Sequence, residues 1–346
     1  MAALDAIYIA EIRSSELLAL QLYFLESIKS GGSEPILITY GLPERAVALG
    51  RYHLYAGPET RQGIDAYRRL TGGRIIGAGH GWLGCALILP SRDWLLPQKN
   101  PALKPEQVMN RYVRGVLAGL RNLGVDAFYP GRDAVTVDRR EFAICSFETD
   151  SSGTMLFETI VAVSRGLENL VHDLELLDPD GALTIPMYSS DAVTTLSREV
   201  GRELSTEEVA KAIEAGYATL TEVRHRELTQ EECSQARSRG DMAARWLTSR
   251  RHDPALRFVG RERLQLGFAE AHVALDSRGQ IERVMMAGDF IANSSGLDAF
   301  EHELGGKRMD LMSVSAAVAK VYADGANYIL GFGDLTNLAR VIMKAS

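Results

Sequence analysis

Lysine is scarce in this chain of 346 residues: only seven of its 38 basic side chains are lysines, and arginine supplies the rest. No lysine lies between Lys104 and Lys211. A codon preference for arginine explains most of this bias. The lysine-free interval nevertheless excludes any chemistry within it that requires an ammonium group.

Cysteines and long apolar runs are also few. Cys85, Cys145 and Cys233 are isolated from one another, so the sequence predicts neither a zinc site nor a disulfide framework. The longest apolar runs, such as 85–90, are far too short to span a membrane. The first residues lack the basic region of a signal peptide. We therefore expect a cytoplasmic protein with no metal centre and no membrane partner.

Positive charge is in overall deficit, because the formal net charge is −7. This charge argues against nucleic acid as a partner, because a protein that binds nucleic acid requires a basic face. A small anionic ligand held by a few arginines is compatible with the same charge. The length suggests two domains of about 150 residues each, and 46% hydrophobic residues is ordinary globular composition. The composition leaves the oligomeric state open.

Apolar periodicity predicts a larger α/β unit over 1–250 and a small α+β unit over 256–346, joined near 250–255. The second unit is expected to contain strands at 262–274 and 281–286, followed by three helices. For the first unit, the pattern predicts helices over 14–30, 105–123, 205–217 and within 229–251, strands over 35–40, 46–50, 85–89 and 155–164, and a hairpin from 134–137 to 141–147.

The most unusual segment is the glycine-rich stretch from Thr71 to Gly84. Its backbone can approach a ligand closely and offer N–H donors to a carboxylate or phosphate. The stretch leads into a strand, whereas a dinucleotide fingerprint would open a helix, and no Gly-Lys-Ser/Thr follows it as in a P-loop. A glycine-rich hairpin without a ligand is the alternative interpretation.

Several motifs, in the right order along nearly the whole chain, resemble the lipoate–protein ligase family. Arg68–Gly73, with the later strand Leu87–Pro90, is similar to the family's lipoyl- and adenylate-binding loop. Val47–Arg51 is similar to the family's strand that ends in Gly-Arg. Gly131–Asp138 resembles the strand before the hairpin that carries the catalytic lysine. The accessory C-terminal domain of the family is similar to Phe268–Asp276 with Gly288–Phe290.

The resemblance implies a mixed-sheet α/β catalytic domain, related to biotin protein ligases, and a small accessory domain. It implies transfer of lipoate or octanoate through acyl-AMP, with ATP and Mg²⁺, to a lysine of a lipoyl carrier domain. Relatives without the ATP step move such groups between carriers through a cysteine thioester. The substrate- and adenylate-binding residues that it indicates are Arg51, Arg69, Thr71, Gly72, Gly73, Arg74, His80, Trp82 and Asp133.

Glu141 stands where the resembled family keeps its catalytic lysine. That lysine contacts the acyl carbonyl and the α-phosphate, and losing one such donor typically costs a factor of about 10²–10³ in rate. A reversed charge about 4 Å away would repel the same groups by about 4 kcal/mol at an effective dielectric constant near 20. Arg139 or Arg140 would replace the cation if the hairpin had a different register.

Other positions in the same predicted pocket also differ from the family pattern. Arg74 replaces a loop glycine and would crowd an adenylate unless its guanidinium binds the phosphate. Trp82 falls near a family asparagine and is expected to fill part of the acyl or adenine space. His80 is expected to be either an acid–base group or a turn residue. Asp133 is expected to orient either an adenylate amine or a metal-bound phosphate. The alternative is that it is a turn residue.

Cys145 is the remaining candidate nucleophile, and a small buried hydrophobe is its alternative role. Three hypotheses remain open. The chain is an ATP-dependent lipoate–protein ligase with a rearranged pocket, a non-catalytic paralogue that binds a lipoyl domain or another partner, or an acyltransferase that uses Cys145.

Overall fold

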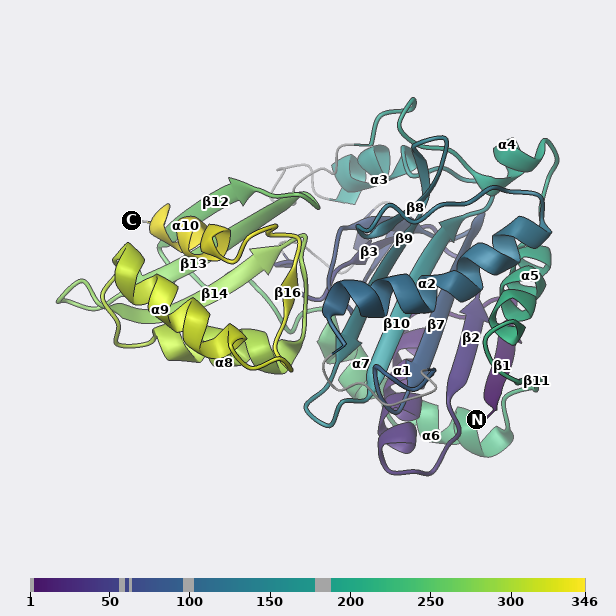
Figure 1. Cartoon of the computed structure of the whole chain (residues 1–346), viewed down its shortest axis with the longest axis horizontal. Helices are drawn as coiled ribbons and strands as arrows, with labels where there is room; N and C mark the ends of the chain where they lie inside the picture. The colour runs from purple at the N-terminus through teal and green to yellow at the C-terminus, as the bar shows by residue number, and fades with distance from the viewer. Residues whose placement is uncertain (1–2, 56–59, 62–63, 96–102, 178–187, 346) are drawn as a thin grey trace.

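Two sheets and a C-terminal unit make up the fold (Figure 1). The computed structural model describes residues 3–55, 60–61, 64–95, 103–177 and 188–345. The predicted mixed-sheet α/β class is confirmed, because the larger sheet contains both parallel and antiparallel pairs. Among the described residues, no helix combines the length and the apolar character that a membrane crossing requires.

The larger sheet runs in the order β11-β1-β2-β7-β10-β9-β8. β1 pairs in parallel with β11 and β2, and the other neighbouring pairs are antiparallel. β7 and β10 are buried along their whole length, as their apolar sequences require. The strands are β1 Leu4–Ile9, β2 Ile36–Tyr40, β7 Trp82–Leu89, β8 Ala134–Val137, β9 Arg140–Thr149, β10 Met155–Ala162 and β11 Val223–His225.

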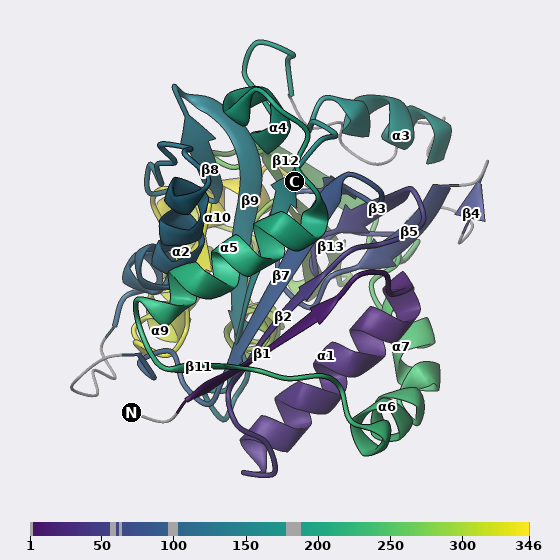
Figure 2. The ribbon, with the colours of Figure 1, turned by 90° about the vertical axis from the view of Figure 1, so that its right-hand side faces the viewer.

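Helices cover both faces of this sheet (Figure 2). α2 (Pro105–Asn122) and α5 (Thr206–Ala218) lie together on one face, while α1 (Ser14–Lys29), α6 (Gln230–Arg237) and α7 (Gly240–Trp246) lie on the other. Glycines allow α2 and α5 to touch, since a Cβ on Gly216 would lie only 2.0 Å from the carbonyl oxygen of Gly115.

The smaller sheet has the order β4-β5-β3-β6 and carries the glycine-rich loop between two of its strands. α3 (Asn169–Leu177) contacts β3 and β6, and the short α4 (Leu196–Val200) follows later in the chain. The strands are β3 Ala46–Leu49, β4 Thr60–Arg61, β5 Ile64–Arg68 and β6 Ile76–Ala78.

The C-terminal unit packs helices on a three-stranded antiparallel sheet and has a hydrophobic cluster of its own. Tyr52 of the larger unit joins that cluster. The boundary at 250–255 stays a prediction. The elements are β12 Phe258–Arg263, β13 Phe268–Leu275, β14 Ile281–Gly288, β15 Ile291–Ala292, α8 Ser294–Leu304, α9 Leu311–Tyr322, β16 Ile329–Leu330 and α10 Thr336–Met343.

The predicted helices and the hairpin are confirmed, and several strands differ from the sequence-based expectation. The single strand expected over 262–274 is two strands, β12 and β13, separated by a turn at 264–267. β1, β5 and the short strands β4, β6, β11, β15 and β16 were not predicted, and β7 begins at Trp82, before the expected strand over 85–89. α1 begins at Ser14 as expected, and the side chain of Arg13, which precedes it, makes no capping bond.

Candidate functional site

The glycine-rich loop between β5 and β6, residues 69–75, is bonded to three other parts of the chain. The hydroxyl of Ser146 on β9 donates to the carbonyl of Gly72 (2.9 Å), and the N–H of Arg51 donates to the carbonyl of Thr71 (2.8 Å). The N–H of Gly73, where φ is +89°, donates to the carbonyl of Phe290 in the C-terminal unit (2.7 Å). The backbone N–H of Gly73, which the sequence analysis expected to bind a ligand, is therefore already bonded to Phe290.

Arg68 fixes the start of the loop to the connection between the two units. Its guanidinium is fully buried and donates to the carbonyls of Arg51 (2.9 Å), His53 (2.5 Å), Leu247 (3.0 Å) and Arg250 (3.2 Å). Burial, together with neighbouring arginines, lowers the pKa of Arg68 to about 9. No carboxylate pairs with it in the described parts of the chain. Arg68 is thus an architectural residue.

Arg69 belongs to a buried polar network under the loop. It donates to the carbonyl of Arg74 (2.6 Å), and the hydroxyl of Thr71 donates to Glu158 (2.5 Å). The amide of Gln21 on α1 donates to the other carboxylate oxygen of Glu158 (2.9 Å). This network contains Arg69 and Thr71, and it adds Gln21 and Glu158, which the sequence did not indicate.

The predicted residues Arg74, Asp133 and Glu141 meet in one ion cluster. Arg74 makes a bidentate contact to Asp133, with Nε–Oδ2 at 2.7 Å and Nη2–Oδ1 at 3.0 Å, and its Nη2 also lies 3.0 Å from Oε2 of Glu141. Asp133 directly precedes β8, and Glu141 lies on β9. The turn that joins these strands, Asp138-Arg139, has positive φ at both residues (46° and 67°).

The ion cluster is nearly enclosed, because 13% of the Arg74 side chain, 2% of Asp133 and 23% of Glu141 are exposed. Burial alone would lower the pKa of the Arg74 guanidinium, but the nearby acidic groups, chiefly Asp133, hold it well above its ordinary value. Tyr188 closes the cluster, with its ring 5.3 Å from the Arg74 guanidinium. Two carboxylates facing one guanidinium leave a formal charge of −1.

The other basic candidates do not reach this cluster. Arg51 donates to the carbonyl of Leu70 (3.1 Å) and lies 4.7 Å from the centre of the Trp246 ring. Arg139 is exposed at the hairpin turn, and Arg140 pairs with Glu199 (3.1 Å). Arg74 is therefore the cation beside Glu141.

His80 and Trp82 line a different part of the molecule. They border a cleft of about 550 Å³, together with the end of β1 and the start of α5, and none of the ion-cluster residues lines it. His80 is exposed, and Trp82 is buried. The structure thus divides the predicted site residues into two groups.

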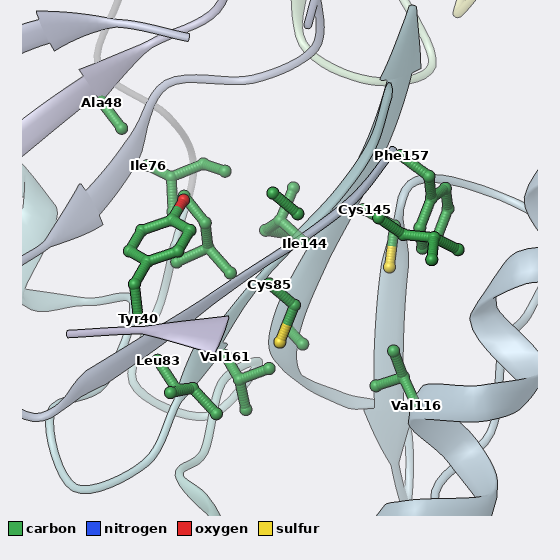
Figure 3. Packing of buried hydrophobic residues seen from close by; sticks show 14 of the residues in the cluster. Tyr40, Ala48, Ile76, Leu83, Cys85, Val116, Ile144, Cys145, Phe157 and Val161 are labelled. Carbon is green, nitrogen blue, oxygen red and sulfur yellow. The ribbon is translucent and has the colours of Figure 1, made fainter. Parts of the chain in front are cut away.

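Cys145 lies on the side of β9 that faces α2 (Figure 3). Its sulfur lies 3.4 Å from the hydroxyl of Thr159, and Figure 3 shows it with Phe157 on the side of Val116 from α2. Ser146, which holds the glycine-rich loop, points to the opposite side. Burial raises the pKa of the Cys145 thiol to about 12, so the thiolate that a nucleophile requires is disfavoured.

Glu148 connects the larger unit to the first turn of α8. Its buried carboxylate accepts from the N–H (2.7 Å) and hydroxyl (2.8 Å) of Ser294 and from the hydroxyl of Tyr52 (3.1 Å). His53 and Asp289 make a second buried contact between the units (2.9 Å). Burial raises the pKa of Glu148 above 4.5 despite these donors.

This raised pKa predicts the pH dependence of one variant. In the native protein, Glu148 contributes most to stability when it is protonated, which is at pH values below its ordinary pKa of 4.5. This contribution is lost as the pH rises through the pKa of the native state. We expect Glu148→Gln to match the wild type near pH 4 and to be more stable near pH 8, as measured by urea unfolding. The exposed Glu34→Gln is the control, and equal stability of wild type and Glu148→Gln near pH 8 would contradict the prediction.

The residues do not fit the Mg²⁺ that the resemblance implies. Both carboxylate oxygens of Asp133 bind Arg74, so neither faces a metal-bound phosphate. Within the described ranges, no group of three or more His, Cys, Asp or Glu side chains is arranged to hold a metal ion.

Comparison with solved structures shows the fold. Lipoate-protein ligase A bound with ATP gives a TM-score of 0.56 at 19% identity, covering 72% of this chain and 99% of the other. LipL1 of P. falciparum, in complex with lipoate, gives 0.69 at 12% identity and covers 99% of both chains. A bipartite ligase of Thermoplasma acidophilum, described with its E2 lipoyl domain, gives 0.56 at 20% identity and covers 72% of this chain and 98% of the other.

Sequence comparison identifies the family. No curated protein matches the chain. The family model for the lipoyl protein ligase A/B catalytic domain matches residues 14–218, which is more than half of the sequence. The matched region contains the glycine-rich loop and the three residues of the ion cluster. The chain therefore belongs to the lipoyl protein ligase A/B family.

Proposed function

We propose that this chain is a non-catalytic member of its family, which binds a lipoyl carrier domain without forming acyl-AMP. The observation that carries the proposal is the ion cluster of Arg74, Asp133 and Glu141. It contains Glu141 where the family pattern has lysine, and among the described residues Arg74 is the only cation that pairs with Asp133 or Glu141.

An adenylate would meet unfavourable electrostatics at this cluster. Its phosphate is anionic, whereas the cluster has a formal charge of −1. To reach Arg74, the phosphate would have to displace Asp133 or Glu141 and leave a carboxylate without its partner in a nearly enclosed position, which is strongly unfavourable. The remaining candidates Arg51, Arg69, Thr71, Gly72 and Gly73 also bond within the protein, which supports a closed arrangement.

The lipoyl domain is the proposed partner because of the family relationship. One structural neighbour is a ligase described with its E2 lipoyl domain, and a member that has lost the chemistry can retain the surface that recognises the carrier. We further propose that the protein acts in the cytoplasm. Its three cysteines are free thiols, as is usual in a reducing compartment.

ATP-dependent ligation is the second candidate function, and one contact favours it. The guanidinium of Arg74 lies 3.0 Å from the Glu141 carboxylate, so a cation does occupy the neighbourhood of the missing lysine. In this alternative, lipoate or octanoate and ATP are the substrates, and Arg74 leaves its carboxylates to contact the phosphate. Cys145 supports no third candidate, because its thiol is buried on the other side of β9.

An adenylation assay separates the two candidates. The full chain is incubated with ATP, Mg²⁺ and either lipoate or octanoate, and acyl-AMP is measured by mass spectrometry. We expect none above background, because losing the lysine alone typically costs a factor of about 10²–10³. Acyl-AMP formed by the wild type that disappears in Arg74→Gln, shown by circular dichroism to be folded, but persists in the hairpin control Arg140→Gln, would establish the second candidate.

Carrier binding is measured separately, by calorimetry with a purified apo lipoyl domain. Saturable binding without acyl-AMP supports the proposed function. If neither binding nor acyl-AMP is detected, the proposal is wrong.

A further inference from the structure

Glu141 is the more accessible carboxylate of the ion cluster. Its side chain is 23% exposed, whereas that of Asp133 is 2% exposed. Both oxygens of Asp133 accept hydrogen bonds from Arg74, while the contact of Arg74 with Glu141 is made at Oε2. The other oxygen, Oε1, accepts no hydrogen bond from the described residues. The cluster therefore has a charged acceptor on its solvent side.

The hydroxyl of Tyr188 is a second polar group at the cluster. Tyr188 is only 7% exposed, and its hydroxyl has no hydrogen-bond partner among the residues that the structure describes. Burial raises the pKa of Tyr188, and the charges of Asp133 and Glu141 raise it further although Arg74 opposes them. The hydroxyl therefore keeps its proton, adds no charge to the cluster and can accept a hydrogen bond.

Negative charge prevails around this hydroxyl. The charged side chains that act most strongly on it are one guanidinium and three carboxylates, those of Arg74, Asp133, Glu141 and Asp289. Asp289 is already bonded to His53 (2.9 Å), and the other two carboxylates still outnumber the guanidinium. A cation placed here is therefore attracted more strongly by the carboxylates than it is repelled by Arg74, whereas an anion would be repelled.

The two acceptors suit a primary ammonium better than a guanidinium. An ammonium is compact and has three N–H donors, which can reach acceptors on separate side chains. A guanidinium is planar and pairs best with both oxygens of one carboxylate, and Arg74 already occupies Asp133 in this way. What is left at the surface is one oxygen of Glu141 and one hydroxyl, which belong to different residues.

We propose that the ion cluster binds a primary ammonium, the lysine side chain of a partner protein, through Glu141 with the Tyr188 hydroxyl as second acceptor. The inference rests on the proposed function, in which this lysine is the one that the resembled family acylates on a lipoyl carrier domain. A lysine in place of Glu141, as in the family pattern, would repel the same ammonium. The preference is therefore a property of this chain.

The proposed site predicts which form of the carrier is bound. Acylation converts the ammonium of lysine into an uncharged amide with a single N–H donor. The amide would lose the attraction of the carboxylates and would carry an alkyl chain into a charged, nearly enclosed position, which is unfavourable. The chain should therefore bind the unmodified carrier and discriminate against the modified one.

The test is isothermal titration calorimetry of the full chain with one purified lipoyl domain in three forms. These are the unmodified domain, the domain octanoylated on its lysine, and the domain with that lysine replaced by methionine. We expect the unmodified domain to bind at least about tenfold more tightly than either of the others, the effect of one hydrogen bond between charged groups.

Variants of the chain locate the preference. Glu141→Gln keeps the shape of the side chain and removes its charge, so it should lose most of the preference, and Tyr188→Phe should lose part of it. The matched control is Asp138→Asn in the same hairpin, an exposed position whose φ of 46° asparagine adopts readily. It changes the net charge equally and should keep the preference. Circular dichroism verifies that each variant is folded.

Three results would contradict these expectations in different ways. Equal binding of all three forms by the wild type would overturn the inference and leave the proposed function intact, because carrier binding would then not depend on the lysine. An equal change in Glu141→Gln and Asp138→Asn would overturn it too, since overall charge would explain the preference. If no form of the carrier binds, the proposed function itself is wrong, and the inference falls with it.

Discussion

Replacing Arg74 by alanine is expected to lower the free energy of unfolding by about 3–5 kcal/mol, the usual cost of removing one partner from a buried ion pair. The reason is the enclosure of the cluster: 2% of the Asp133 side chain and 23% of Glu141 are exposed. Without the guanidinium, the two carboxylates would face each other with little solvent. Such a loss is a large part of the about 5–15 kcal/mol that stabilises a typical protein.

Urea unfolding of the full chain measures this effect. The control is Lys211→Ala, which removes an exposed i,i+4 pair with Glu207 and should cost well under 1 kcal/mol. The triple variant Arg74→Met/Asp133→Asn/Glu141→Gln should recover much of the stability, because it removes all three charges together. A loss below about 1 kcal/mol in Arg74→Ala would mean that water screens the cluster, and would favour Arg74 as a cation available to substrate.

Gly216→Ala is expected to destabilise the protein by about 1–3 kcal/mol, although alanine is the better helix former. In an open helix, this change would gain about 1 kcal/mol. Here the new methyl group would lie 2.0 Å from the Gly115 carbonyl oxygen and 2.4 Å from the Gly119 nitrogen, so α2 and α5 would have to separate. Overpacking of this kind outweighs the helix preference.

The matched control is Gly240→Ala, at the first residue of α7, where an added Cβ has nothing within 4 Å. It should leave the unfolding free energy unchanged or slightly raised. If Gly216→Ala and Gly240→Ala change the unfolding free energy equally, then Gly216 is not required for the close packing of α2 against α5.

Local patterns predicted most of the fold because the relevant information lies within each segment. The capping box that begins at Ser205, the proline at the start of α2 and the turn between β8 and β9 define their elements without distant contacts. β1 and β5 were missed because an aspartate, Asp5 or Asp65, interrupts the apolar pattern of each strand. The turn at 264–267 was missed because apolar residues continue through it.

The site was predicted less completely, since its contacts cross between elements. Arg74 and Glu141 were each singled out against the resembled family, but the sequence did not show that the two side chains pair with each other. Glu158 was missed because its bonds to Gln21 and Thr71 depend on the packing of α1 under the loop. Tyr188 had no sequence signal.

The bond from the Gly73 N–H to the Phe290 carbonyl links the C-terminal unit thermodynamically to the state of the glycine-rich loop. Any ligand that accepts a hydrogen bond from Gly73 competes with Phe290. Binding in the loop would therefore weaken the attachment of the C-terminal unit, and loosening that unit would strengthen binding by the same factor, since coupling between two equilibria is reciprocal.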